Sequence, residues 1–238
     1  GHRVEKLGGY LKKSDRVLEV GSGPGYFLHA IRDLVSEIQG IELNRKEAQY
    51  ATEAKNIPTS NLPMENTDVS LSHFDHICIF QVLEHAADPI KFLKNLAKYG
   101  KPGSFIHIEV PNINDPLVAF YDVPNYRDFY YQEPHLYYYN VDSLSMICKK
   151  AGFEIDRIYG FQQTSLINNL NWAFLEKPQA SRFDCIKPEL PSGKINANIP
   201  ESAKSRFNNF LANMNQQYIQ LMESMDYADM LFASIRIK

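Results

Sequence analysis

The chain has 238 residues, of which 44% are hydrophobic and 22% charged, enough apolar material for one sizeable core. Its net charge of −3 and pI of about 6.2 disfavour a nucleic-acid-binding protein, which would present a basic face. No apolar run is long enough to span a membrane, so we expect no membrane partner. The cysteines are far apart, at Cys78, Cys148 and Cys185, and a reducing cytoplasm is therefore the expected location.

The first informative stretch, residues 16–28, has the sequence RVLEVGSGPGYFL. Its apolar run predicts a buried parallel strand, and the apolar spacing over residues 26–35 predicts a helix. A strand, a glycine turn and a helix open a doubly wound sheet, which binds its ligand over the turn. A ligand that touches the backbone leaves no room for Cβ atoms, and the turn accordingly contains Gly21, Gly23 and Gly25.

The spacing of these glycines indicates the ligand. It does not match the G-x-G-x-x-G dinucleotide fingerprint, because the third glycine would fall at Tyr26 or Leu28, and no P-loop lysine follows. The pattern is an acidic residue, Glu19, followed by alternating glycines. It resembles motif I of the class I S-adenosylmethionine-dependent methyltransferases. The methionine end of that cofactor carries an ammonium group and no phosphate, so a nearby carboxylate favours it. A glycine turn without a ligand is the alternative.

The next strand carries a residue expected at the adenosine end of the cofactor. Residues 38–43 predict this strand, and Glu42 near its end is where doubly wound folds place a carboxylate on the ribose hydroxyls. An ordinary exposed glutamate is the alternative. The resemblance implies Asn61 at the adenine edge, where the family usually has Asp, and Leu62 on the adenine face. The expected cofactor-binding set also includes Tyr26 and Leu43.

A second motif lies in residues 73–89, HFDHICIFQVLEHAADP, whose apolar part predicts a strand over 77–82. The stretch VLEHAADP resembles motif IV of the same family and is similar to the V-L-E-H-x-x-D-P of many small-molecule methyltransferases. This resemblance implies that Gln81 lies near the bound methionine and that Glu84 and His85 lie at the mouth of the site. His85 has two interpretations, a structural residue that holds the loop or a proton acceptor.

Residues 115–140, which follow a predicted fifth strand over 104–110, are crowded with aromatic rings. Rings with hydroxyl tips suit a sugar or another polyhydroxylated acceptor, and tyrosine-rich surfaces are equally typical of subunit interfaces. We expect this segment to bind the acceptor. The expected acceptor-binding residues are Asn112, Tyr130, Glu133, Tyr137 and Tyr139.

The same segment contains the expected catalytic base. Residues 133–139, EPHLYYY, resemble the E-H-x-x-Y-F of sugar methyltransferases, in which the histidine is the base. His135 would take the proton of the acceptor hydroxyl, because the pKa of histidine is near neutrality. Pro134 separates it from Glu133, which leaves open which of the two faces the acceptor. A buried, hydrogen-bonded histidine is the alternative.

The remaining patterns complete the expected sheet. The last strand, 230–238, is expected to insert antiparallel between the fifth strand and a sixth strand at 153–161. The insert at 162–228 contains a long loop at 181–200 and an amphipathic helix at 201–225. It is interpreted as a lid, as a homodimer contact, or as a helix that only covers the core. Further helices are expected over 45–55, 89–99 and 142–151, and a third strand within 56–66.

These patterns together predict an α/β fold in a single domain over residues 3–238. The fold is a doubly wound seven-stranded sheet, parallel except for an antiparallel last strand, which is the class I methyltransferase fold with a helical insert before that strand. The resemblance implies S-adenosylmethionine as cofactor, no metal, and methyl transfer to a hydroxyl of a small polar acceptor. The preferred acceptor is a nucleotide-activated sugar, for example a heptose, of a bacterial capsular or surface polysaccharide. The alternatives are C-methylation of a keto sugar, O-methylation of a small phenol or quinone, and a non-catalytic donor-binding scaffold.

Overall fold

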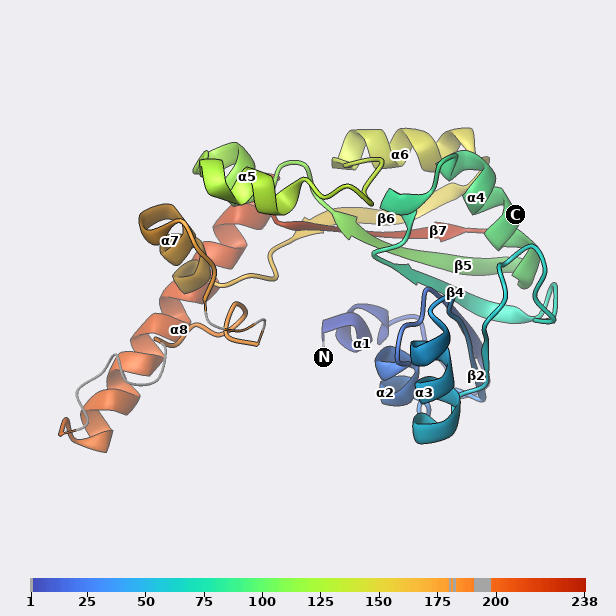
Figure 1. The fold of residues 1–238 in the computed structure, drawn as a ribbon, viewed down its shortest axis with the longest axis horizontal. Coiled ribbons are helices and arrows are strands. Elements are labelled where there is room, and N and C mark those ends of the chain that lie inside the picture. Colours follow the sequence, from blue (N-terminus) through green and yellow to red (C-terminus); the bar gives the residue numbers. More distant parts are fainter. Residues whose placement is uncertain (1, 180, 182, 191–197) are drawn as a thin grey trace. The chain divides into compact units, whose positions relative to one another are not determined.

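The computed structural model describes residues 2–179, 181, 183–190 and 198–238 (Figure 1). The chain divides into two compact units. Unit 1 comprises residues 1–110, 142–158 and 232–238, and unit 2 comprises residues 111–141 and 159–231. Among the described residues, no helix has both the length and the apolar character needed to cross a membrane.

Seven strands form one sheet in the order β3-β2-β1-β4-β5-β7-β6. Strands β1 to β5 pair in parallel, and β7 runs antiparallel to β5 and β6. This arrangement confirms the predicted fold class, including the last strand between the fifth and the sixth. The strands are β1 (Arg16–Val20), β2 (Glu37–Ile41), β3 (Thr59–Ser60), β4 (Phe74–Phe80), β5 (Gly100–Pro111), β6 (Glu154–Phe161) and β7 (Met230–Arg236).

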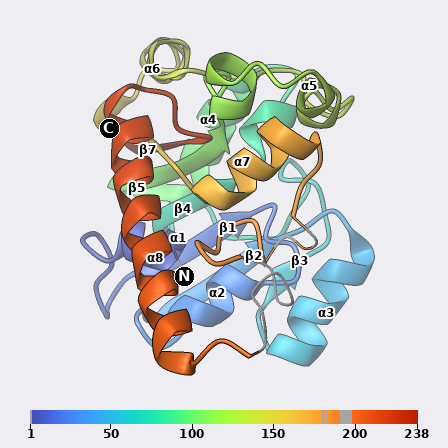
Figure 2. The ribbon, with the colours of Figure 1, turned by 90° about the vertical axis from the view of Figure 1, so that its left-hand side faces the viewer.

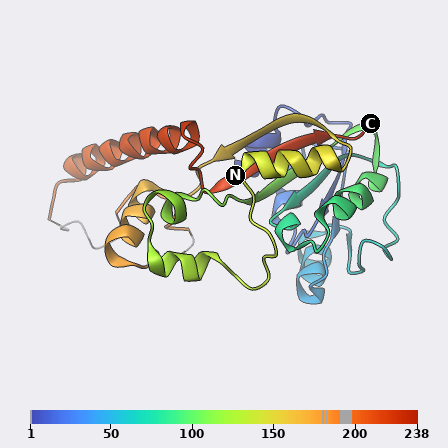
Figure 3. The ribbon, with the colours of Figure 1, turned by 90° about the horizontal axis from the view of Figure 1, so that it is seen from above.

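Helices cover both faces of the sheet in unit 1. Helices α1, α2 and α3 lie on one face, and α4 and α6 lie on the other (Figures 1 and 3). Helix α2 ends at Ile31, earlier than the spacing predicts, because a turn closes there with a hydrogen bond from Leu34 N–H to the Ile31 carbonyl. The helical elements are α1 (His2–Leu7), α2 (Tyr26–Ile31), α3 (Arg45–Lys55), η1 (Leu83–His85), α4 (Pro89–Leu96), η2 (Ala97–Tyr99) and α6 (Val141–Lys150).

A buried chain of polar side chains connects the middle strands of unit 1. Ser234 on β7 lies 2.9 Å from His107 on β5, His107 lies 3.0 Å from His76 on β4, and His76 lies 3.0 Å from Asp15. The Asp15 carboxylate can only accept, so His76 donates to it from Nε2 and accepts from His107 at Nδ1. His107 in turn accepts from the Ser234 hydroxyl, so every bond of the chain is donated towards Asp15. Burial lowers the pKa of both histidines, which favours these neutral rings.

Unit 2 is built around an aromatic core that the sequence does not predict. Its buried side chains include Tyr126, Tyr130 and Trp172, packed on Leu117 and Val118. The helical elements are η3 (Pro116–Phe120, a π-helical turn), α5 (Pro124–Tyr130), α7 (Leu166–Leu175) and α8 (Glu201–Ser224), and Figure 2 shows the last two. Helix α8 matches the amphipathic helix predicted over 201–225, whereas residues 182 and 191–197 of the loop predicted over 181–200 lie outside the described residues.

Candidate functional site

The glycine turn connects β1 to α2 with an unusual backbone. Gly21, Gly23 and Gly25 have φ angles of 74°, 52° and 75°, in the left-handed region that other residues rarely adopt. At Gly21 an added Cβ would lie 2.5 Å from the Val82 side chain, so the segment between β4 and η1 packs directly on the turn. At Gly23 the nearest atom would be a Glu47 carboxylate oxygen at 3.4 Å, a van der Waals contact, so the backbone is less crowded there than at Gly21.

Glu42, directly after β2, is fixed at this turn. Its carboxylate accepts hydrogen bonds from the Gly23 N–H at 2.8 Å and from the Asn44 N–H at 2.7 Å. Both bonds are to a charged acceptor and hold the side chain in one orientation before any ligand arrives. A pre-oriented carboxylate beside a glycine turn is suited to two neighbouring hydroxyls, as predicted for ribose.

The side chains expected around adenine lie on the surface of unit 1. Leu43 and Leu62 are exposed although they are apolar. The Asn61 amide donates to the carbonyls of Glu42 and Leu43, at 2.8 and 3.0 Å, and so fixes the loop after β2. The Tyr26 ring is exposed and lies under the Lys55 ammonium at 5.4 Å. Contact of these residues with adenine stays a prediction.

Buried carboxylates gather at the carboxyl ends of β1 and β5. Burial raises the pKa of Glu19 to about 8, with Arg3 opposing the shift and Glu109 adding to it. Burial also opposes ionisation of Glu109, but hydrogen bonds from His2 and Arg3 outweigh it and lower the pKa of this residue. The Arg3–Glu109 contact is 2.6 Å long, and the Arg3 guanidinium lies 4.6 Å from the centre of the Phe80 ring. The sequence analysis did not identify Arg3 or Glu109, although Glu109 ends a strand at the ligand-binding edge.

Gln81 follows β4 in a strained conformation. Its φ is 61°, which is uncommon for a residue with a side chain, and its N–H donates to the Glu109 carbonyl at 2.8 Å. The Gln81 Nε2 and the Glu19 Oε2 are buried and have no hydrogen-bond partner among the described residues. Such orphaned polar atoms need a ligand or water to satisfy them.

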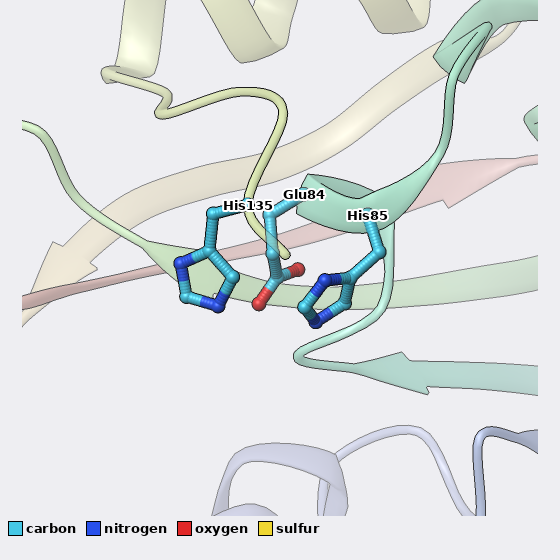
Figure 4. A group of neighbouring side chains, drawn as sticks. All are labelled: Glu84, His85 and His135. Atoms are coloured by element: carbon cyan, nitrogen blue, oxygen red, sulfur yellow. The ribbon is translucent and has the colours of Figure 1, made fainter. Parts of the chain in front are cut away.

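The short turn η1 places two further groups after β4. Glu84 is fully buried and both of its carboxylate oxygens lack a partner within the described residues. Burial raises the pKa of Glu84 to about 7, and the charge of Glu109 adds to this shift. His85 is exposed, and Figure 4 shows its ring on the same side of the turn as the Glu84 carboxylate. Glu84 is the residue to which the sequence analysis gave no role.

Two of these groups offer atoms that metal ions bind. A carboxylate oxygen of Glu84 and a ring nitrogen of His85 lie within 4.8 Å of each other. Oxygen and imidazole donors suit divalent cations, and such sites need at least one ligand more. Activity should therefore be measured both with added divalent cations and with a chelator.

In unit 2, three of the expected acceptor-binding residues are buried and hold the backbone. The Tyr130 hydroxyl donates to the Asn112 carbonyl at 2.5 Å, and the Asn112 amide donates to the Ala228 carbonyl at 2.7 Å. Tyr139 is 1% exposed and pairs with Asn112 in a short β-bridge. Glu133 and Tyr137 are exposed. The role of all five in acceptor binding stays a prediction.

His135, drawn in Figure 4, has a defined tautomer within unit 2. Tyr138 donates its hydroxyl proton to the Tyr130 carbonyl at 2.7 Å, so its oxygen accepts from His135 Nδ1 at 3.0 Å. The neutral ring then carries its basic lone pair on Nε2. This tautomer is the one that a proton acceptor with Nε2 as its basic atom requires.

A family model described as a methyltransferase domain matches residues 1–158. The chain belongs to this family, and its sheet is that of the class I methyltransferases, whose cofactor is S-adenosylmethionine. The residues fit this cofactor. The glycine turn would cradle it, the pre-oriented Glu42 carboxylate would accept from the ribose, and the orphaned atoms of Glu19 and Gln81 would bind the methionine end.

Comparison with curated proteins gives partial matches. Over 127 residues the chain is 26% identical to the ubiquinone biosynthesis O-methyltransferase of Bordetella avium, covering 49% of this chain and 51% of that protein. Over 111 residues it is 31% identical to an uncharacterized methyltransferase of Schizosaccharomyces pombe, covering 41% and 40%. The chain thus spans about half the length of the curated relatives it matches.

Solved structures share the fold over nearly the whole chain. A SAM-dependent methyltransferase from Archaeoglobus fulgidus has a TM-score of 0.59 and 19% identity, covering 99% of this chain and 91% of that chain. One from Mesorhizobium loti has a TM-score of 0.58 and 14% identity, covering 99% and 98%. The [4+2]-cyclase SpnF also matches, with a TM-score of 0.57 and 14% identity, covering 99% and 80%. These likenesses show the fold, and the reaction needs separate arguments.

Proposed function

We propose that this chain transfers the methyl group of S-adenosylmethionine to an oxygen atom of a small acceptor. The observation that carries the proposal is the donor cradle of unit 1, in which Glu42 is fixed on the backbone of Gly23 while Gln81 Nε2 and Glu19 Oε2 have no partner. The cofactor supplies a methyl group on a positively charged sulfur. Glu42 would hold the ribose, and the Glu19 carboxylate would bind the positive methionine end.

The acceptor hydroxyl must lose a proton as the methyl group arrives, and Glu84 is our first choice for the base. Its pKa of about 7 gives a substantial carboxylate fraction at neutral pH together with useful basicity. His85 and His135, the bases predicted from the sequence, are the alternatives. Alignment of the acceptor oxygen with the methyl group and exclusion of water supply the rest of the rate enhancement.

We further propose a small phenol as the acceptor, which promotes one alternative of the sequence analysis over its preferred nucleotide sugar. Tyr126, Tyr130 and Tyr139 are buried in unit 2, so the rings of residues 115–140 that remain exposed are fewer and more apolar than the sequence suggests. The exposed large hydrophobic side chains of this segment are Phe120, Phe129, Tyr131, Leu136 and Tyr137. The name of the partial relative from Bordetella avium, a ubiquinone biosynthesis O-methyltransferase, also supports a phenolic acceptor.

The nucleotide sugar remains the second candidate. The exposed residues Glu133 and Tyr137 favour it, because a carboxylate and a phenol can both hydrogen-bond a polyhydroxylated ring. Transfer to carbon of a keto sugar would use the same base to form an enolate. A donor-binding scaffold without turnover is the alternative of a different class, and the SpnF fold match shows that this fold also occurs in a protein named for another reaction.

A mass-spectrometric assay tests the proposal. The protein is incubated with S-adenosylmethionine and, in parallel, with ortho-dihydroxylated phenols, nucleotide sugars and 4-keto nucleotide sugars, each with and without a chelator. We expect a phenol to gain the mass of one methylene, and NMR of the product then separates transfer to oxygen from transfer to carbon. Donor binding by calorimetry without any product would refute the enzymatic proposal and favour the scaffold.

Binding of the cofactor is expected to weaken as the pH falls below about 8. Glu19, whose pKa burial raises to about 8, must lose its proton to face a positive ligand, so the dissociation constant should rise by up to about tenfold per pH unit below that value. Calorimetric titration across pH measures this slope, and Glu19→Gln should flatten it. The free energy of unfolding of the ligand-free chain depends on pH in the opposite direction to the affinity for the cofactor. The folded chain keeps this proton longer than the unfolded chain, so its stability falls as the pH rises from the ordinary carboxyl range towards 8.

A further inference from the structure

Helix α1 is too short to be stable on its own. It has six residues, His2–Leu7, whereas isolated helices of fewer than about 12 residues are marginal in water. Its position therefore depends on contacts with the rest of unit 1. Leu7 is fully buried in the core, and an arginine fixes each end of the helix.

Arg157, on β6, fixes the carboxyl end of α1. Its guanidinium donates a hydrogen bond to the Lys6 carbonyl in the last turn, where helix carbonyls lack intrahelical donors. The same guanidinium lies 4.6 Å from the centre of the Tyr10 ring and 5.6 Å from the centre of the Phe232 ring on β7. A planar guanidinium that stacks on rings while it hydrogen-bonds a carbonyl has one defined orientation, which a lysine cannot reproduce.

Arg3, three residues before Lys6, fixes the other end of α1 and reaches the donor site. Its Nε and Nη2 donate to Glu109 Oε1 at 3.0 and 2.6 Å, and its guanidinium lies 4.6 Å from the centre of the Phe80 ring. Residues three apart are neighbours on one side of a helix, about 4.5 Å apart along its axis. The anchor at Lys6 therefore decides where the Arg3 side chain lies.

The charge of Arg3 acts on the buried Glu19. Burial raises the pKa of Glu19 to about 8, Arg3 opposes this shift, and the charges of Glu109 and Glu42 add to it. Cys78 on β4, the register partner of Glu19, is neutral because burial raises the pKa of its thiol well above the usual value. Displacement of Arg3 would therefore keep Glu19 protonated up to a higher pH.

We propose that Arg157 is a positioning residue of the donor site, although it lies on β6 and acts only through α1. Arg157 holds α1 in place, and α1 keeps Arg3 on Glu109. Arg3 in turn favours the charged form of Glu19, which would bind the positive methionine end of the cofactor. This inference rests on the donor site proposed above and is independent of the acceptor.

Calorimetric titration of the full chain with S-adenosylmethionine across pH tests the proposal. Arg157→Gln should move the pH below which the affinity falls upward by about one unit, the usual effect of losing a neighbouring cation. At pH 7 the dissociation constant should then rise by about tenfold.

Arg236→Gln on β7 is the matched control. Arg236 lies 4.5 Å from the centre of the Phe105 ring and 3.8 Å from Asp156, so its loss removes the same charge and leaves the Lys6 anchor in place. It should change the dissociation constant of the cofactor by less than about twofold, as is usual for an exposed ion pair.

A double variant separates positioning from a general loss of stability. In an Arg3→Gln chain, adding Arg157→Gln should cost no further affinity, because Arg157 acts through Arg3. Thermal unfolding verifies that each variant is folded. If Arg157→Gln does not fold, Arg157→Lys, which keeps the charge but loses the stacked fork, should show the same upward shift in pH to a smaller extent.

Wild-type affinity and pH dependence in the folded Arg157 variant would overturn the proposal. Effects of Arg157→Gln and Arg3→Gln that add in full would also overturn it. A wild-type chain that does not bind S-adenosylmethionine would refute the donor site itself, and this inference with it.

Discussion

Replacing Glu84 with Gln is expected to lower methyl transfer by about 10²–10⁴-fold, the usual contribution of a general base. Gln fills nearly the same volume in a fully buried position, so the fold and the donor site should remain intact. The wild-type rate should rise with pH through about 7 as the Glu84 carboxyl ionises, and the variant should lose this limb. Turnover across pH, measured beside calorimetric donor affinity, provides both readouts.

His85→Asn on the same turn tests the alternative base. His85 is exposed, and if it serves only to hold the loop the variant should keep most of the activity. Normal turnover of the Glu84→Gln variant would contradict its role as base and indicate one of the histidines instead. His135→Asn would then be the decisive variant. Loss of donor affinity in Glu84→Gln would instead indicate a structural role for the carboxylate.

Removing the Glu42 carboxylate, as in Glu42→Ala, should weaken S-adenosylmethionine binding by roughly 100-fold. The two ribose hydroxyls would each lose a charge-assisted hydrogen bond worth about 1.5 kcal/mol. The Gly23 and Asn44 N–H groups would also lose the acceptor that organises the turn. Calorimetric titration of the folded variant with the cofactor measures the loss.

Glu53→Ala is the matched control for this experiment. Glu53 lies on the exposed side of α3, where it contacts Gln49, and its loss removes the same charge from the neighbourhood. It should change the affinity less than about twofold. If Glu42→Ala and the wild type bound the cofactor with similar affinity, a residue other than Glu42 would bind the ribose.

Local signals explain why much of unit 1 could be predicted. Helix α3 has the predicted bounds because the Asn44 side chain caps its first turn and Asn56, with φ of 54°, ends it. Asp88 and Pro89 start α4 in the same way. The glycine turn and the Glu42 position follow from spacing alone, since the fold fixes where a strand, a turn and a second strand end meet.

Tertiary packing explains what the sequence did not reveal. The aromatic content of residues 115–140 is visible in the sequence, but the packing of Tyr126 and Tyr130 in one core with Trp172, far away in the chain, is not. The hydroxyl of Tyr130 is used by the backbone of Asn112. Glu84 could be located by its motif, but its burial, and with it a pKa near neutrality, depends on neighbours that no spacing rule identifies.

The position of β7 has a consequence for how this protein is made. The strand lies between β5 and β6, yet it follows them by many residues, and the family model ends before it at residue 158. During synthesis β5 and β6 leave the ribosome first, each with an unpaired edge that can template aggregation. The sheet closes only when Met230–Arg236 emerge and Ser234 reaches His107. A nascent chain of this kind therefore depends on slow, long-range strand pairing, and its folding yield should be sensitive to the temperature and rate of expression.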